Sequence, residues 1–193
     1  MNTTLLLGLF IFFATHSVRI IADDWRSAAI VRLGPLPWKS LIVILSLISF
    51  GLMVWGYGTA RSAPVELWSP PRLAGYLAAL LTLPAFILLV AAYVPGNRLK
   101  AAVGHPMVAG VKLWALSHLL ANGNLADVLL FGSFLVWAGL SFSAARRRDR
   151  RAGTCYPVGT LLQTLLTIFI GGLAWIIFAV SLHEILIGVR PFG

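Results

Sequence analysis

Six long apolar runs, separated by short polar segments, limit what this chain can fold into more than any other feature. They extend from about Thr4 to Arg26, Ser40 to Tyr57, Gly75 to Pro95, Met107 to Ala121, Leu125 to Ala145 and Val158 to Gly188. A run of about 20 apolar residues can cross the hydrocarbon core of a bilayer as an α-helix. Because lipid offers no water to backbone groups, a crossing segment must satisfy them internally. The sequence therefore predicts an all-α, polytopic membrane bundle of about six transmembrane helices.

The amino-acid composition excludes a soluble globular protein. Charged residues make up 11% of the 193 positions, whereas about a quarter of a soluble domain is charged. We find no internal repeat, so residues 1–193 are expected to form a single transmembrane domain. The run from Met107 to Ala121 is the shortest and carries Lys112. It forms either a full crossing or a re-entrant hairpin with the next run, and the turn residues Asn122-Gly123-Asn124 favour two crossings.

The distribution of basic residues predicts the orientation. Six crossings put the first, third and fifth connections on one side, with ten basic residues: Arg26, Arg32, Lys39, Arg98, Lys100, Arg146, Arg147, Arg148, Arg150 and Arg151. The other side holds three: Arg61, Arg72 and Arg190. The positive-inside rule then places the basic side in the cytoplasm and both termini on the outer side of the membrane. Arginines beside a span usually set topology, so nucleic acid is not an expected partner.

The N-terminal run and the cysteine give little information about function. The N-terminal run lacks a basic leader and a small-residue cleavage pattern, so it is expected to remain as a span. Cys155 is the one cysteine, which permits neither an internal disulfide nor a cysteine-based metal cluster. Asp127 is expected near the outer interface, in contact with water.

Four histidines are the most informative polar residues, because a polar group in hydrocarbon needs a partner or a function. At 1.5 Å per residue, His16 lies about 18 Å from Thr4 and His118 lies about 16 Å from Met107, so both are near mid-bilayer. His105 is expected at the cytoplasmic start of the fourth helix and His183 at the outer interface. Hydrogen bonding between helices is one explanation for the two central histidines.

A haem is the other explanation. Two imidazoles without a cysteine or carboxylate at their depth would leave zinc under-coordinated, but haem needs only one or two axial ligands. Arg19 and Lys112 lie nearer the cytoplasm than His16 and His118, where they and His105 could receive the haem propionates. Asn122, four residues after His118, could orient its ring. Lys112 could instead extend its amine toward the membrane surface.

A family resemblance rests on several segments. They are His105–Gly123, Trp55-Gly56-Tyr57-Gly58, Leu67-Trp68-Ser69-Pro70-Pro71 and the stretch from Leu83-Pro84-Ala85-Phe86 to Pro95-Gly96. Together they resemble the NnrU family, named for bacterial denitrification and nitric-oxide-related genes, and the resemblance covers most of the chain. The family is similar to the plant and cyanobacterial 15-cis-ζ-carotene isomerase, a membrane haem b enzyme.

The resemblance implies a bacterial inner membrane, so that both termini would be periplasmic. It also implies haem b as cofactor, with His16 and His118 as iron ligands. In the isomerase, one ligand is implied on the first shared helix and the other ends a Trp-Cys-Leu-Ala-His segment. These positions correspond to His16 and to His118 in Trp114-Ala115-Leu116-Ser117-His118. The isomerase cysteine falls on Ala115, which argues against switching between cysteine and histidine ligands.

Three functional classes remain open. The first is a haem b protein of redox or nitric-oxide metabolism, with a redox partner. The second is a cis-trans isomerase acting on a hydrophobic small molecule, such as a polyene, taken from the lipid bilayer. The third is a structural membrane subunit without a cofactor. The missing cysteine and the bacterial family favour the first.

The orientation gives a testable prediction. A reporter that is active only in the cytoplasm, fused after Gly193, should give no signal, because the asymmetry of basic residues places the C-terminus outside. The same reporter placed after Arg151 should be active. A bright C-terminal fusion would refute this orientation.

Overall fold

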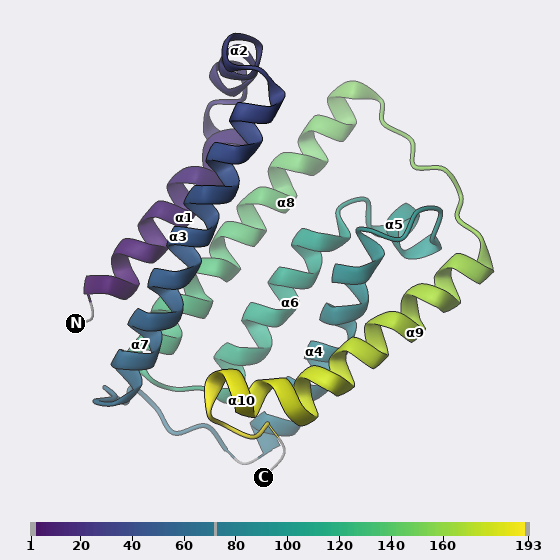
Figure 1. The fold of residues 1–193 in the computed structure, drawn as a ribbon. Coiled ribbons are helices and arrows are strands. Elements are labelled where there is room, and N and C mark those ends of the chain that lie inside the picture. Colours follow the sequence, from purple (N-terminus) through teal and green to yellow (C-terminus); the bar gives the residue numbers. More distant parts are fainter. Residues whose placement is uncertain (1–2, 72, 192–193) are drawn as a thin grey trace. The chain divides into compact units, whose positions relative to one another are not determined.

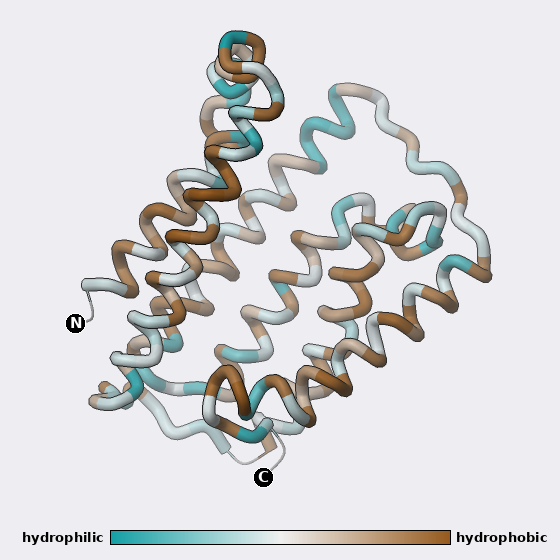
Figure 2. The backbone as a smooth tube through the Cα atoms, in the orientation of Figure 1, coloured by the Kyte–Doolittle hydropathy of each residue, from teal (hydrophilic) through white to brown (hydrophobic). Residues whose placement is uncertain are grey.

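The computed structural model describes residues 3–71 and 73–191, and the described chain is almost entirely helical (Figure 1). It divides into two compact units, Met1–Val65 and Glu66–Gly193. Figure 2 shows that hydrophobic residues dominate the long helices, whereas hydrophilic residues gather at helix ends and in connections.

The first unit is a pair of long helices joined by a short one: α1 (Thr3–Ile21), α2 (Asp23–Leu33) and α3 (Pro35–Arg61). The helices α1 and α3 pack closely at two glycines. A Cβ on Gly8 would lie 2.8 Å from the backbone nitrogen of Met53, and one on Gly56 would lie 2.3 Å from that of Leu5. Small residues thus allow the two backbones to approach, as is common between membrane helices.

The segment α2 differs from the sequence prediction. The first helix was expected to continue to Arg26, but it ends at Ile21, and the chain turns at Ala22 with φ −140° and ψ 53°. Asp23 and Asp24 then occupy the first turn of α2, where carboxylates interact favourably with the positive end of the helix dipole. A new helix is therefore more favourable here than a continuation.

The second unit contains the remaining helices. They are α4 (Leu73–Ala91), α5 (Arg98–Val103), α6 (Pro106–Ala121), α7 (Leu125–Asp127), the π-helix η1 (Val128–Gly132), α8 (Ser133–Ala152), α9 (Leu161–Ile177), the π-helix η2 (Phe178–Leu182) and α10 (His183–Ile187). The helix α6 packs against α4 and α8, and α9 packs against α4. The four long helices therefore follow one another in space in the order α8, α6, α4, α9 (Figure 1).

The all-α membrane architecture is confirmed. Within the described residues, five helices are long and apolar enough to cross a membrane: Thr3–Ile21, Pro35–Arg61, Leu73–Ala91, Leu125–Ala152 and Leu161–Ile187. The sixth, α6, has 16 residues and agrees closely with the run expected from Met107 to Ala121. The chain is thus a multi-pass membrane protein. The two π turns, each inside a long helix, were not predicted.

Short connections fix the helix ends in the second unit. The side chain of Asn97 is buried, donates to the carbonyls of Ala91 and Val94, and accepts from the amide of Lys100 at 2.7 Å. At the opposite ends of the helices, Asp127 is also buried, and its carboxylate accepts from the amide of Asn124 at 2.9 Å. The expectation that Asp127 contacts water is therefore wrong, because the carboxylate caps the start of its own helix.

Two adjacent glycines of α9 allow a matched test of its packing on α4. A Cβ on Gly171 would lie 2.6 Å from the Cα of Ile87, a backbone atom that cannot rotate away, whereas a Cβ on Gly172 would meet nothing within 4 Å. Gly171→Ala should therefore destabilise the protein by about 1–3 kcal/mol, and Gly172→Ala should change stability little. Unfolding midpoints in detergent measure both. Equal midpoints would contradict this packing.

Candidate functional site

His16 lies in α1 with its ring held by its own helix. The ring nitrogen Nδ1 is 2.9 Å from the carbonyl oxygen of Phe12, and since a carbonyl only accepts, Nδ1 carries the proton. The Phe12 ring stacks on the imidazole at 4.0 Å between centroids and 16° between planes. Nε2 faces Ser46 of α3 at 3.4 Å, but the Ser46 hydroxyl donates to the carbonyl of Ile42 at 2.6 Å. The ring therefore places Nδ1 on its own helix and Nε2 toward α3.

His118 lies in the last turn of α6 in a similar arrangement. Its Nδ1 is 2.9 Å from the carbonyl oxygen of Trp114, four residues earlier. The ring is flanked by Trp114 at 5.3 Å and by Phe131 at 4.6 Å between centroids. Phe131 comes from the π turn η1, which packs on α6. Trp114 and Phe131 therefore hold the ring from two sides, with the Nε2 lone pair available to a ligand.

The two histidines share one local design. Each follows an aromatic residue by four positions, donates Nδ1–H to the carbonyl of that residue, and packs against its ring. Metal-ligating histidines usually donate their other ring N–H in this way, which fixes the tautomer and the ring orientation. His16 and His118 thus each have the chemistry of a metal ligand, one in each unit.

The remaining candidates have different environments. Arg19 lies in the last turn of α1 and is exposed. Lys112 lies on the exposed side of α6, and no hydrogen bond or ion pair with another described residue engages its amine. Asn122 donates to the backbone carbonyl of His118 at 2.8 Å. It therefore caps the helix, and the ring is oriented by Trp114 instead.

His105 belongs to a polar cluster at one end of the second unit. Its Nε2 lies 2.8 Å from an Asp149 carboxylate oxygen, to which the Tyr156 hydroxyl also donates at 2.9 Å. The cluster joins the start of α6, the end of α8 and the connection to α9. The side chains of His105 and Asp149 are 26% and 15% exposed. Sequence reasoning identified His105 but neither of its partners.

Asp149 and Tyr156 have shifted pKa values, and both lie beyond the apolar part of their segments. Burial would raise the pKa of Asp149, but hydrogen bonds from Tyr156 and His105 and the charges of His105 and Arg146 outweigh it, so the pKa is lower than usual. Burial, followed by the hydrogen bond to Asp149, raises the pKa of Tyr156. The cluster therefore pairs an ionised carboxylate with a neutral phenol.

His183 is held differently from the two central histidines. Its Nδ1 lies 2.7 Å from the carbonyl oxygen of Val189, near the end of the chain, and its ring meets Phe178 edge-on at 5.9 Å. Next to it, Glu184 pairs with Arg190 at 2.8 Å. The ring of His183 therefore ties the C-terminal turn to α10.

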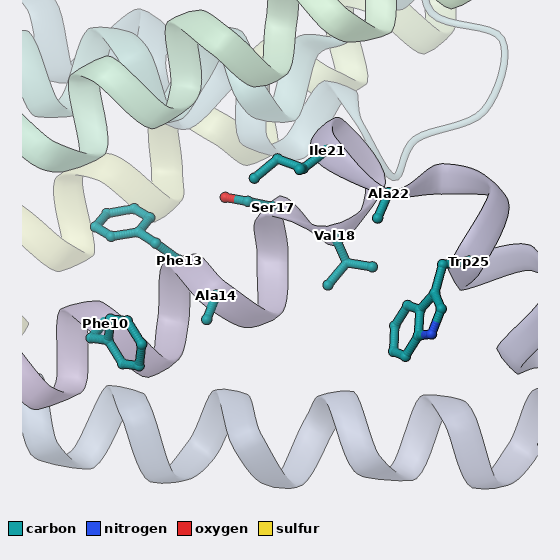
Figure 3. Close-up of a pocket in the computed structure, with 8 residues that line it drawn as sticks. All are labelled: Phe10, Phe13, Ala14, Ser17, Val18, Ile21, Ala22 and Trp25. Atoms are coloured by element: carbon teal, nitrogen blue, oxygen red, sulfur yellow. The ribbon is translucent and has the colours of Figure 1, made fainter.

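An open apolar groove runs along α1 and the start of α2 (Figure 3). Phe10, Phe13 and Trp25 are the large side chains that line it, and Ser17 is its single polar side chain. His16 does not line the groove, because it lies on the side of α1 that faces Ser46 of α3. The groove and the candidate ligand therefore occupy different faces of one helix.

No group of three or more His, Cys, Asp or Glu residues within residues 3–71 and 73–191 is arranged to hold a metal ion. The sequence also contained a signal that was missed. An aromatic residue precedes each central histidine by four positions, as Phe12 and Trp114, and this spacing predicts contact on a helix. Phe131 had no comparable signal, because its position depends on the π turn.

Comparison with known proteins identifies a family that covers nearly the whole chain. The family model described as NnrU protein matches residues 4–191. No curated protein and no solved structure matches the chain.

Acid should weaken the cluster of His105, Asp149 and Tyr156. A carboxyl with a lowered folded-state pKa contributes stability that is complete above its unfolded pKa of about 3.9 and is lost as pH falls through the folded value. The unfolding midpoint should therefore drop below about pH 4. Asp149→Asn should be less stable than wild type at neutral pH and should lose less on acidification. Asp24→Asn, at an exposed position, serves as the control and should respond to acid as the wild type does. If Asp149→Asn and the wild type lost stability equally on acidification, the proposed role of the cluster would be contradicted.

Proposed function

Because the chain belongs to the NnrU family, we propose that it is a haem b-binding integral membrane protein with a redox or nitric-oxide-related role in denitrifying metabolism. One observation supports this above all others. Two histidines in separate apolar helices, His16 and His118, each donate Nδ1–H to a backbone carbonyl. Such rings offer Nε2 in a fixed direction, which is what an axial iron ligand requires.

The donor set fits haem better than a bare metal ion. Zinc in a protein requires three or four ligands, whereas haem iron receives four nitrogens from its own ring and needs only axial ligands. Phe12 and Phe131, which pack on the two imidazoles, would also offer apolar surface to a porphyrin. His16 and His118 would be the two axial ligands.

Basic residues would hold the two propionates. Lys112 is the best candidate for binding a propionate, because an amine within an apolar helix needs an anion. No described residue supplies that anion. Arg19, three residues after His16, is the second candidate. His105 is engaged by Asp149 at 2.8 Å, so its contribution would come through this cluster. Asn122 would support the site by capping α6 just after His118.

The proposed ligands favour electron transfer. When bound through two imidazoles, a haem supplies a one-electron redox centre without an open coordination position. The position of the isomerase cysteine is occupied by Ala115, which is fully buried and cannot coordinate iron. A redox partner at the membrane is therefore a better match than a polyene substrate.

Histidine substitution tests the cofactor directly. His16→Ala or His118→Ala should abolish or strongly shift the Soret band of the detergent-purified protein, because each removes an axial ligand. His183→Ala should leave the band nearly intact, since that ring is bonded to Val189. Wild-type spectra for both central variants would rule out this ligand pair, and a colourless wild-type protein would leave only a cofactor-free structural role.

A complementation experiment in cells distinguishes the isomerase alternative from the proposed redox role. Cells that accumulate 15-cis-ζ-carotene should not be rescued by this chain, since Ala115 cannot replace a departing histidine. Rescue that depends on His16 and His118 would establish isomerase activity on the same haem site.

A further inference from the structure

The end of α8 extends beyond the depth of the hydrocarbon. The helix from Leu125 to Ala152 is continuous over 28 residues, and about 20 residues suffice to cross the bilayer core of about 30 Å. Counted from Leu125, the crossing is complete near Ala145. The segment from Arg146 to Ala152 then continues for about 10 Å, which is enough to pass through the headgroup layer of about 5–8 Å on that side.

In this segment, the positive and the negative side chains lie on different faces of the helix. At 100° per residue, Arg146, Arg147, Arg150 and Arg151 fall within an arc of about 140°. All four side chains are exposed. Asp149 lies outside this arc and contacts His105 and Tyr156 instead. The one carboxylate of the segment is thus turned toward the protein with the Arg146 guanidinium near it, whereas Arg147, Arg150 and Arg151 are exposed on the outward side of the helix.

Three of these arginines have no partner within the described chain. No hydrogen bond or ion pair among residues 3–71 and 73–191 engages Arg147, Arg150 or Arg151. Other basic groups of the second unit are used internally, since Arg98 donates to the carbonyl of Gly159 and Lys100 to that of Ala92. The arginine face, defined as Arg147, Arg150 and Arg151, therefore differs from the basic residues of α5.

Two simpler explanations do not account for this face. The helix dipole favours cations in the last turn, but it does not require three guanidinium groups on one side. The orientation of a membrane protein depends on how many basic residues a connection carries, not on which side of a helix they occupy. The gathering of arginines on one face, with the carboxylate directed away, indicates a ligand.

We propose that the arginine face binds the phosphate groups of anionic phospholipids at this end of α8. A guanidinium group forms paired hydrogen bonds to phosphate oxygens, and basic clusters next to a membrane span attract anionic lipids. The depth of the segment favours lipid over an acidic protein or a nucleic acid, because these arginines lie where lipid phosphates already are. The connection that follows, 153–160, contains no acidic residue that could compete.

The single cysteine allows a local measurement. Cys155 is exposed and lies four residues after Arg151, so a nitroxide attached to it reports on the lipids around the arginine face. The full chain would be placed in nanodiscs of equal parts phosphatidylglycerol and phosphatidylcholine. The nitroxide should relax the phosphorus signal of phosphatidylglycerol several-fold more than that of phosphatidylcholine, and the difference should decrease with salt.

Matched variants identify the residues responsible. The triple variant Arg147→Gln, Arg150→Gln, Arg151→Gln should lose the preference for phosphatidylglycerol. Replacing the same three residues with lysine should retain part of it, because charge remains while the guanidinium fork is lost. The control variant Arg26→Gln, Arg32→Gln, Lys39→Gln removes the same charge from the first unit and should keep the full preference.

Several outcomes would overturn the proposal. A wild-type protein that relaxes both lipids equally has no anionic lipid site at this position. A preference that survives the glutamine variant, or that is lost equally in the control, would assign the effect to total charge. Removal of the preference by glycerol phosphate at a matched concentration would show that the face binds free phosphate. Removal of the preference by an equal concentration of an acidic peptide would assign the face to a protein partner.

Discussion

The structure depends on one constraint, which is that a polar group within lipid must find its partner inside the protein. The chain meets this requirement mostly within single helices. The hydroxyl of Thr15 donates to the carbonyl of Ile11 at 2.7 Å, and that of Thr167 donates to Gln163 at 2.6 Å. His16 and His118 satisfy Nδ1 in the same way. Neither ring therefore leaves its Nδ1–H without an acceptor inside the apolar helix.

This constraint also explains how much the sequence could reveal. Apolar runs predict helices reliably when only a helix can cross lipid, and α4 and α6 therefore lie where the runs placed them. The depth predicted for His16 and His118 rests on residue counting alone and stays a prediction. Their tautomers could not be predicted in this way, although the aromatic residues Phe12 and Trp114 at four-residue spacing would have suggested ring contacts on each helix.

Other features depend on contacts between segments that are distant in sequence. Asp149 and Tyr156 join His105 across 44 and 51 positions, and no pattern near any of the three residues indicates this. Asp127 was predicted to be an interfacial charge, but its carboxylate caps the start of its own helix. The short helix α2 follows from a balance between continuing an apolar helix and starting a new one at two aspartates, which run length alone cannot decide.

The π turn at 128–132 sets the rotational phase of the whole helix that contains it. Phe131, within the turn, contacts the ring of His118, and Asp149, after the turn in α8, contacts His105. A π turn accommodates about one residue more than an α-helical turn. Shortening the helix by that residue would rotate one end by about 100° relative to the other, so that only one of the two contacts could persist. A single turn thus keeps the two ends of a helix about 40 Å long in register.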